Sequence, residues 1–302
     1  MNLKLWLRAT RFHIVLSGSS PFFVATAFAY YKNHAFNFLL FFLTWLTMTA
    51  FLISTNLLND YYDHLSKADD LNPSSTHLSG GSRVIQQGLV SEKTMLHGSI
   101  VSLLFASIIG LYLNFILDGI TLLLLGVIGF FIIYFYAAPP IKLNYRGFGE
   151  IAQTIGYGPV IIFGAYYVQT KVISREIILF SIPVTLFGLI IGMIVSIPDY
   201  EADKKVKKRN LVVILGKEKT VIFYGLILAL IFICDALLLY FAIIPLWSSI
   251  VFVLVPFAVL SIVNAFKNMN STTLFLRTSN LTLLIAALHN YLFVIILILS
   301  SI

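Results

Sequence analysis

Residues 37–63 read NFLLFFLTWLTMTAFLISTNLLNDYYD, an apolar run that ends in a short acidic motif. No charged residue precedes Asp60 in this stretch, and the run is as long as the roughly 20 apolar residues that a helix needs to cross the hydrocarbon core of a bilayer. The stretch therefore predicts a membrane-spanning helix that carries carboxylates out to the membrane edge.

The rest of the chain repeats this apolar pattern. Of its 302 residues, 59% are hydrophobic and only 11% are charged, a composition too apolar for the surface of a water-soluble globule. The windows between charged clusters predict about nine spans, and so an all-α integral membrane protein in which residues 1–302 form one domain. The predicted spans are 13–31, 37–58, 96–115, 119–138, 149–170, 177–198, 220–241, 244–265 and 280–301.

The formal net charge of +7 raises nucleic-acid binding as an alternative, but the distribution of the charge favours membrane topology. If the N-terminus is cytoplasmic, all of the 20 Lys and Arg residues except Lys32, Lys171 and Arg175 fall on the cytoplasmic side. The positive-inside rule describes this asymmetry. We therefore expect a multi-pass protein of the plasma membrane with a cytoplasmic N-terminus, membrane lipid as its surroundings and no nucleic-acid partner.

Two long polar segments, 59–95 and 199–219, lie on the cytoplasmic side in this topology. In the first motif, Asn56, Asn59, Asp60 and Asp63 are three or four residues apart, so they share one face if the helix continues past the membrane edge. Like charges at this spacing repel one another. A divalent cation is the simplest way to offset that repulsion.

The second acidic motif is Asp199-Tyr-Glu201-Ala-Asp203, in which Asp199 and Asp203 lie one helical turn apart. The candidate ligands are all oxygen donors, which favours a hard cation such as Mg²⁺, and Mg²⁺ usually binds one or two carboxylates together with phosphates. The alternative is a solvated turn at a helix end, but two such clusters on one side of a chain so poor in acids argue against it. The predicted metal ligands are Asn59, Asp60, Asp63, Asp199 and Asp203, with a diphosphate as the expected partner.

A diphosphate also requires positive charge nearby. Arg83 lies in a Ser-Gly-Gly-Ser turn, Lys142 follows Pro139-Pro140, and Lys208 belongs to the basic run 204–209. Tyr136 lies at the predicted end of a span, where it is either an interfacial anchor or an aromatic face for an allylic cation. Topology alone would also explain part of this basic charge.

Polar residues also occur inside the predicted spans. Asp235 lies within 220–241, where an ionised carboxylate costs roughly 2.5–3.5 kcal/mol on insertion scales. No acidic or basic residue lies beside it in the sequence, so we expect a neutral or hydrogen-bonded role between helices. His289 and Asn290 are expected to serve helix packing.

These motifs together resemble the UbiA superfamily of membrane prenyltransferases, and within it the MenA-type 1,4-dihydroxy-2-naphthoate prenyltransferases. The similarity covers roughly residues 8–217, with the motifs in family order. Phe12 stands where the family has proline after an arginine that matches Arg11, and the loop 70–80 is longer than usual. The similar stretches are NLLNDYYD at 56–63 followed by Asp69, GGSRVIQQGL at 80–89, YAAPPIKLNYRG at 136–147, GP at 158–159, YYVQT at 166–170 and DYEADKKVKKRNLVV at 199–213.

The resemblance implies a nine-helix bundle around a central cavity, with a Mg²⁺–diphosphate site on the cytoplasmic side and a lateral opening for the prenyl tail. The implied reaction moves a polyprenyl group from its diphosphate to an aromatic acceptor, most closely 1,4-dihydroxy-2-naphthoate in menaquinone biosynthesis. Asp60, Asp63, Asp199 and Asp203 would be catalytic. The residues that would bind the substrates are Arg11, Asn56, Arg83, Tyr136, Lys142 and Lys208.

Alternatives remain at this stage. Within the family the acceptor could instead be 4-hydroxybenzoate, homogentisate or a glycerol-phosphate lipid, because motif spacing does not describe the acceptor pocket. Outside it, a cation-coupled transporter also uses acidic residues, but transporters bind their ions near the bilayer midplane, whereas these carboxylates lie at span ends.

Overall fold

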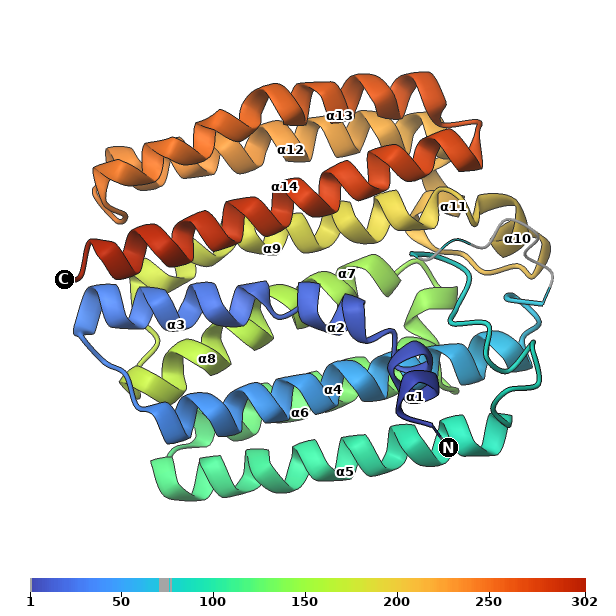
Figure 1. The fold of residues 1–302 in the computed structure, drawn as a ribbon, viewed down its shortest axis with the longest axis horizontal. Helices are drawn as coiled ribbons and strands as arrows, with labels where there is room; N and C mark the ends of the chain where they lie inside the picture. Colours follow the sequence, from blue (N-terminus) through green and yellow to red (C-terminus); the bar gives the residue numbers. More distant parts are fainter. Residues whose placement is uncertain (1, 71–75, 77) are drawn as a thin grey trace.

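The structure is a computed structural model that describes residues 2–70, 76 and 78–302. Within those residues the chain is helical, and its sole β-type pairing is an isolated bridge between Arg146 and Arg209. Figure 1 shows long helices lying side by side, with short helices and loops collected at the end of the bundle that holds the N-terminus. The loop 70–80, expected to be longer than usual, lies largely outside the described residues.

Nine helical stretches in the described part of the chain are long and apolar enough to cross a membrane, which confirms the predicted number of spans. Each one overlaps a predicted window. The spans are α2 (Phe12–Ser17) with α3 (Ser20–Asn33), α4 (Phe38–Leu65), α5 (Glu92–Leu117), α6 (Ile120–Ala137), α7 (Gly149–Ile155) joined through a π-helical turn (Gly156–Val160) to α8 (Ile161–Thr170), α9 (Arg175–Ser196), α12 (Lys217–Tyr240), a 3₁₀ segment (Leu246–Leu254) with α13 (Val255–Asn268), and α14 (Thr272–Leu299).

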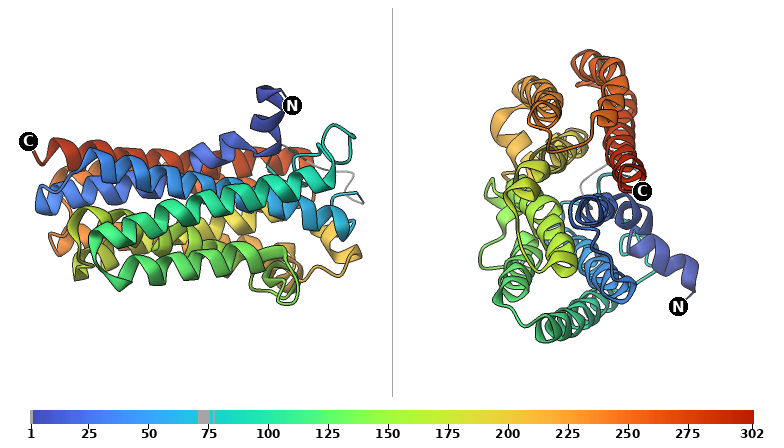
Figure 2. Two further views of the ribbon diagram at one scale, coloured as in Figure 1. Left: turned by 90° about the horizontal axis from the view of Figure 1, so that it is seen from below. Right: turned by 90° about the vertical axis from the view of Figure 1, so that its left-hand side faces the viewer.

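Four short elements lie outside these spans: α1 (Leu3–Ala9), a 3₁₀ turn (Leu143–Tyr145), α10 (Tyr200–Lys205) and α11 (Leu211–Leu215). The side view in Figure 2 shows α1 standing out from the bundle. The chain breaks between α1 and α2 at Arg11, which adopts a left-handed conformation with φ of 48°. This break turns the Arg11 side chain toward the end of α4.

Local sequence explains where the spans begin. The side chains of Asn37, Ser91 and Ser174 each accept a hydrogen bond from the backbone N–H three residues later, which caps α4, α5 and α9. No proline or glycine interrupts residues 38–65, so α4 continues seven residues past the predicted boundary at 58. The continuation confirms that the first acidic motif is helical.

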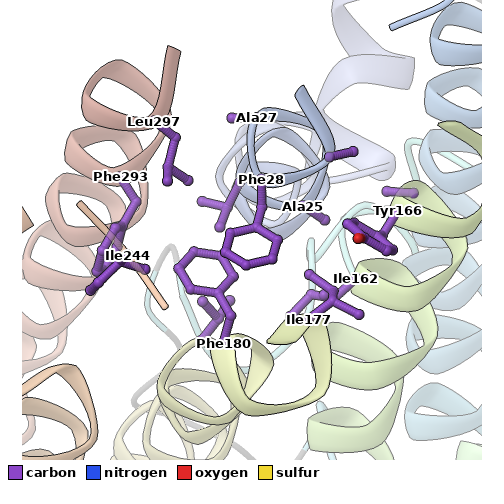
Figure 3. Close-up of a cluster of buried hydrophobic side chains, with 14 of the residues drawn as sticks. Ala25, Ala27, Phe28, Ile162, Tyr166, Ile177, Phe180, Ile244, Phe293 and Leu297 are labelled. Atoms are coloured by element: carbon purple, nitrogen blue, oxygen red, sulfur yellow. The ribbon is translucent and has the colours of Figure 1, made fainter. Parts of the chain in front are cut away.

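The helices α3 and α9 form the centre of the bundle, since most of their membrane-spanning windows are buried. Phe28 of α3 stacks on Phe180 of α9 with ring centroids 4.4 Å apart, and Phe293 of α14 packs edge-on against Phe180 at 5.3 Å (Figure 3). By contrast, α5 and α6 expose large apolar side chains such as Phe115 and Val127, as lipid-facing helices do. The aromatic centre therefore supports one side of an interior space whose other wall is built by α4 and α6.

Candidate active site

A cavity of about 820 Å³ runs along the inside of the bundle. Its wall includes Thr47, in the first half of α4, and Asp63, near the end of α4, which are separated by about 24 Å at about 1.5 Å per residue. One end is charged and is called here the acidic end; Asp63, Asp199, Asp203 and Lys208 line it. Beyond it the wall is largely apolar, so the cavity suits a ligand with an anionic head and a long hydrocarbon tail.

The helix α4 directs its acidic motif to two different places. Asn56, Asn59 and Asp63 lie on the cavity wall, whereas Asp60 is buried behind it. Asp60 forms an ion pair with the Arg11 guanidinium, and its other oxygen accepts the Ser82 backbone N–H at 2.9 Å. Asp60 therefore ties the N-terminal segment and the Gly-Gly-Ser turn to the end of α4.

Lys208 lies between the two acidic motifs. Its Nζ is 3.2 Å from Asp63 Oδ2, 3.6 Å from Asp203 Oδ1 and 5.6 Å from the centre of the Tyr145 ring. Burial alone would lower the pKa of Lys208, but Asp63 and Asp203 outweigh it and raise that pKa well above the ordinary value. Lys208 is thus a permanently charged group at the centre of the acidic end.

Tyr145 and Asn210 complete this arrangement, and neither was among the predicted site residues. The Tyr145 hydroxyl donates to Asp63 Oδ1 at 2.7 Å, and burial together with the Asp63 charge raises the pKa of Tyr145, so it remains a neutral donor. Asn210 donates from Nδ2 to Asp203 Oδ2 at 2.6 Å while its Oδ1 accepts the Val213 N–H and caps α11. The capping pattern before the apolar run at 211–215 was the available sequence signal for Asn210.

Negative charge is crowded at the acidic end. Asp69, a further residue that was not predicted as a ligand, is buried on the cavity wall, and burial followed by repulsion from Asp63 and Asp60 raises its pKa to about 8. Burial also raises the pKa of Asp203 to about 7, with Asp199 and Asp63 adding to the effect and Lys208 opposing it. A further cation would relieve this crowding.

The donor atoms at the acidic end are oxygens, the ligand type that a hard cation prefers. They are carboxylate oxygens from both motifs and the Asn59 Oδ1 atom, which is buried and has no hydrogen-bond partner among the described residues. Within the described ranges, no group of three or more His, Cys, Asp or Glu side chains surrounds one point, so a closed cage of the zinc type is not present. Sparse oxygen donors completed by substrate phosphates are the usual manner of Mg²⁺ binding.

Two of the predicted substrate-binding residues lie off the cavity wall, and the others line it. Arg83 donates to the backbone oxygen of Asp69, and Lys142 Nζ lies 5.5 Å from the centre of the Tyr145 ring; both are off the cavity wall. Asn56 donates to the Thr10 backbone oxygen at 2.9 Å. The predicted site residues that line the cavity are Arg11, Asn56, Asn59, Asp63, Tyr136, Asp199, Asp203 and Lys208.

Glu150 anchors the segment that carries Lys208. It is buried at the start of α7, and its Oε1 and Oε2 both accept the Leu211 N–H, at 3.1 and 3.0 Å. The backbone bridge between Arg146 and Arg209 joins the same two segments. Glu150 and the bridge hold residues 208–211 against the beginning of α7, which presents Lys208 to Asp63.

A bundle of membrane-spanning helices with an apolar cavity, closed at one end by carboxylates and a buried lysine, defines a membrane-embedded protein with a site suited to a long amphiphilic ligand. A family model places the chain more narrowly: residues 20–299 match the UbiA prenyltransferase family, and the chain belongs to that family. It is a prenyltransferase, as the resemblance of its motifs predicted.

Named relatives agree with the family assignment. The chain is 28% identical over 256 residues to 1,4-dihydroxy-2-naphthoate octaprenyltransferase of Bacillus subtilis, covering 85% of this chain and 80% of that protein. It is 28% identical over 239 residues to the enzyme of the same name from Haemophilus influenzae, covering 77% and 76%. A UbiA homologue from Archaeoglobus fulgidus, solved with GPP and Mg²⁺, has the same fold with a TM-score of 0.61 at 16% identity, covering 96% of this chain and 99% of that one.

Proposed function

We propose that this prenyltransferase moves a polyprenyl group from its diphosphate to 1,4-dihydroxy-2-naphthoate, with Mg²⁺ as the cofactor. The observation that carries the proposal is the polarity of the cavity: Lys208 and carboxylates from two motifs close one end of a long apolar chamber. The names of the relatives support the acceptor, since two of them are called 1,4-dihydroxy-2-naphthoate octaprenyltransferase.

In this proposal the diphosphate head binds at the acidic end and the prenyl tail occupies the apolar length of the cavity. Asn59, Asp60, Asp63, Asp199 and Asp203 would hold the metal. The bound ion would neutralise the diphosphate and act as a Lewis acid on its departure. Asp60 is engaged with Arg11 and Ser82, so its participation would require the Arg11 contact to open.

The residues of the chain favour cleavage of the carbon–oxygen bond in several ways. The electron pair of that bond leaves with the diphosphate, and the Lys208 ammonium stabilises the charge that accumulates there. Tyr136 lies on the cavity wall, where its ring would face the allylic cation. Apolar walls exclude water from the cation until the electron-rich acceptor ring forms the new carbon–carbon bond and releases its carboxylate as CO₂.

We also propose the orientation in the membrane. The acidic end would face the cytoplasm of a cell whose plasma membrane contains the protein, because all Lys and Arg residues except Lys32, Lys171 and Arg175 then lie on that side. A water-soluble diphosphate head and acceptor would reach the site from the cytoplasm.

The test is to incubate membranes that contain the protein with Mg²⁺, a long-chain prenyl diphosphate and 1,4-dihydroxy-2-naphthoate, and to detect prenylated product by mass spectrometry. We expect Mg²⁺-dependent product that is lost in Asp63→Ala and Asp199→Ala. The matched control is Glu201→Ala, because Glu201 belongs to the same motif but is exposed to solvent. Product with 4-hydroxybenzoate, homogentisate or a glycerol-phosphate lipid, and none with 1,4-dihydroxy-2-naphthoate, would overturn the proposed identity of the acceptor. Ion flux without release of diphosphate would overturn the enzymatic assignment in favour of a transporter.

A further inference from the structure

A chain of buried hydrogen bonds crosses the bundle inside the membrane, away from the acidic end. Asp235 of α12 contacts His289 of α14, with 2.9 Å between Oδ2 and Nε2. Asn290 Oδ1 lies 3.2 Å from His289 Nδ1, and Asn290 Nδ2 donates to Ser20 Oγ of α3 at 2.9 Å. Ser20 Oγ then lies 3.3 Å from the hydroxyl of Tyr157, whose ring lies on the cavity wall. This series of hydrogen bonds therefore connects the Asp235 carboxylate, deep between helices, to the cavity.

The first pair in this chain can remain inside the membrane because it is neutral as a unit. Asp235 and His289 are fully buried, and the rings of Phe187 and Phe293 each lie 4.8 Å from the His289 ring. Asn290 Oδ1 can only accept, so His289 Nδ1 carries a proton. The pair then holds either a carboxylate with an imidazolium or a carboxylic acid with a neutral imidazole, and both forms have no net charge.

The available donors decide one of the remaining hydrogen bonds and leave the other reversible. Asn290 Nδ2 can only donate, so Ser20 Oγ accepts from it, while the Ser20 and Tyr157 hydroxyls can each donate to the other, 3.3 Å apart. When Ser20 donates to Tyr157, the Tyr157 O–H is available to another acceptor, and Tyr157 lines the cavity.

The Tyr157 ring is held in place by its packing. Gly188 of α9 lies so close that a Cβ there would stand 2.8 Å from Tyr157 Cδ1. Tyr157 follows the beginning of α7 by about two helical turns, roughly 12 Å at the helical rise, so the residue lies in the wall beyond the segment that Glu150 anchors. It shares that wall with apolar residues such as Val160 and Ile191. A fixed hydroxyl donor on an apolar wall selects a ligand oxygen.

We propose that Tyr157 is a positioning residue that donates a hydrogen bond to an oxygen substituent of the aromatic acceptor, and that the buried chain from Asp235 to Ser20 fixes the direction of this donor. The inference rests on the proposed function. A prenyl tail has no oxygen to accept this bond, and the diphosphate belongs to the acidic end. Of the reacting partners, the acceptor ring is therefore the one that carries an oxygen this donor can use.

The test compares wild type with Tyr157→Phe, which removes the hydroxyl and keeps the ring. Binding of two non-reacting probes, 1-hydroxy-2-naphthoate and unsubstituted naphthalene, is measured with purified protein, and the KM values for acceptor and prenyl diphosphate are measured separately. We expect Tyr157→Phe to lower the affinity for 1-hydroxy-2-naphthoate about three- to tenfold, which is the effect of one hydrogen bond. The affinity for naphthalene and the KM for prenyl diphosphate should not change. Asp235→Asn should shift the hydroxynaphthoate affinity in the same direction by a smaller factor.

Tyr224→Phe is the matched control, because Tyr224 is also a buried membrane tyrosine but bonds to Ser261 and Thr282 away from the cavity. Unchanged hydroxynaphthoate affinity in Tyr157→Phe would overturn the inference, and so would an equal loss in Tyr224→Phe or no binding of the probe to wild type. Failure of the proposed function is distinguishable: wild type would then bind the probe but form no product with 1,4-dihydroxy-2-naphthoate. The binding comparison would still decide the role of Tyr157.

Discussion

The Lys208 ammonium lies 3.2 Å from the Asp63 carboxylate although the two residues are 145 positions apart in the chain. The same ammonium is 3.6 Å from Asp203, so it bridges the two acidic motifs. Lys208 is therefore both the structural link between the motifs and the cation nearest to where a diphosphate would bind.

Lys208→Met should destabilise the protein and abolish most activity. Removing one partner of a buried ion pair leaves uncompensated charge, which costs about 3–5 kcal/mol. Loss of a charge that stabilises the leaving group should lower kcat by about 100-fold or more. Thermal unfolding and product formation measure the two effects. Lys205→Met is the control, because Lys205 is an exposed lysine of the same basic run and should change neither.

Tyr145→Phe should reduce activity by about 10- to 100-fold, because a hydrogen bond to a carboxylate contributes about 1.5–3 kcal/mol. Without the 2.7 Å bond, Asp63 loses the group that fixes its second oxygen. Steady-state kinetics at varied Mg²⁺ should show the defect as a weaker apparent affinity for Mg²⁺, so that half-maximal turnover requires a higher Mg²⁺ concentration. Tyr200→Phe offers the comparison, since its ring lies beside Lys204 and Lys217 rather than against a carboxylate. Equal activity of both variants would contradict the role of Tyr145.

Two substitutions of Asn210 should separate its two contacts. Asn210→Ser keeps a hydroxyl that caps α11 but loses the amide that donates to Asp203, so activity should fall while the unfolding temperature stays near that of wild type. Asn210→Ala loses both contacts and should also lose about 1 kcal/mol of stability. If the two variants were equally unstable, the Asp203 contact and not the cap would be the main contribution of Asn210 to stability.

Gly81→Ala should damage the site more than Gly88→Ala. Both glycines have positive φ, 73° and 67°, so alanine strains the backbone in each case. A Cβ at Gly81 would overlap the Asp69 carboxylate, whereas a Cβ at Gly88 would meet no atom of the described residues within 4 Å. We therefore expect similar small losses of stability but a loss of prenyl transfer only for Gly81→Ala. Parallel unfolding and activity measurements on the two variants test this.

Much of the site could be predicted because its parts are local in the chain. Asn59 and Asp63 are neighbours on one turn of α4, with Asn59 Nδ2 donating to Asp63 Oδ2 at 3.2 Å, and helical periodicity alone places them together. The same reasoning did not separate Asp60 from Asp63, which point to different partners. It also expected Arg83 and Lys142 to act at the diphosphate, while the structure places both off the cavity wall.

The hydrogen-bonded role between helices that was expected for Asp235 is confirmed, but the sequence did not identify the partner. His289 contacts Asp235 from 54 positions away in the chain. Hydropathy windows identify each span from its own residues, because the cost of placing a segment in lipid depends on the composition of that segment.

The sequence by itself determined the number of spans, the helical acidic motif at the end of α4 and the family to which the chain belongs. Only the tertiary structure decided which side chains meet: Lys208 with Asp63 and Asp203, Glu150 with the backbone of Leu211, and Asp235 with His289. The physical reason is that spans form from local hydrogen bonds and hydrophobicity, whereas contacts between helices depend on rotation and depth, which packing sets.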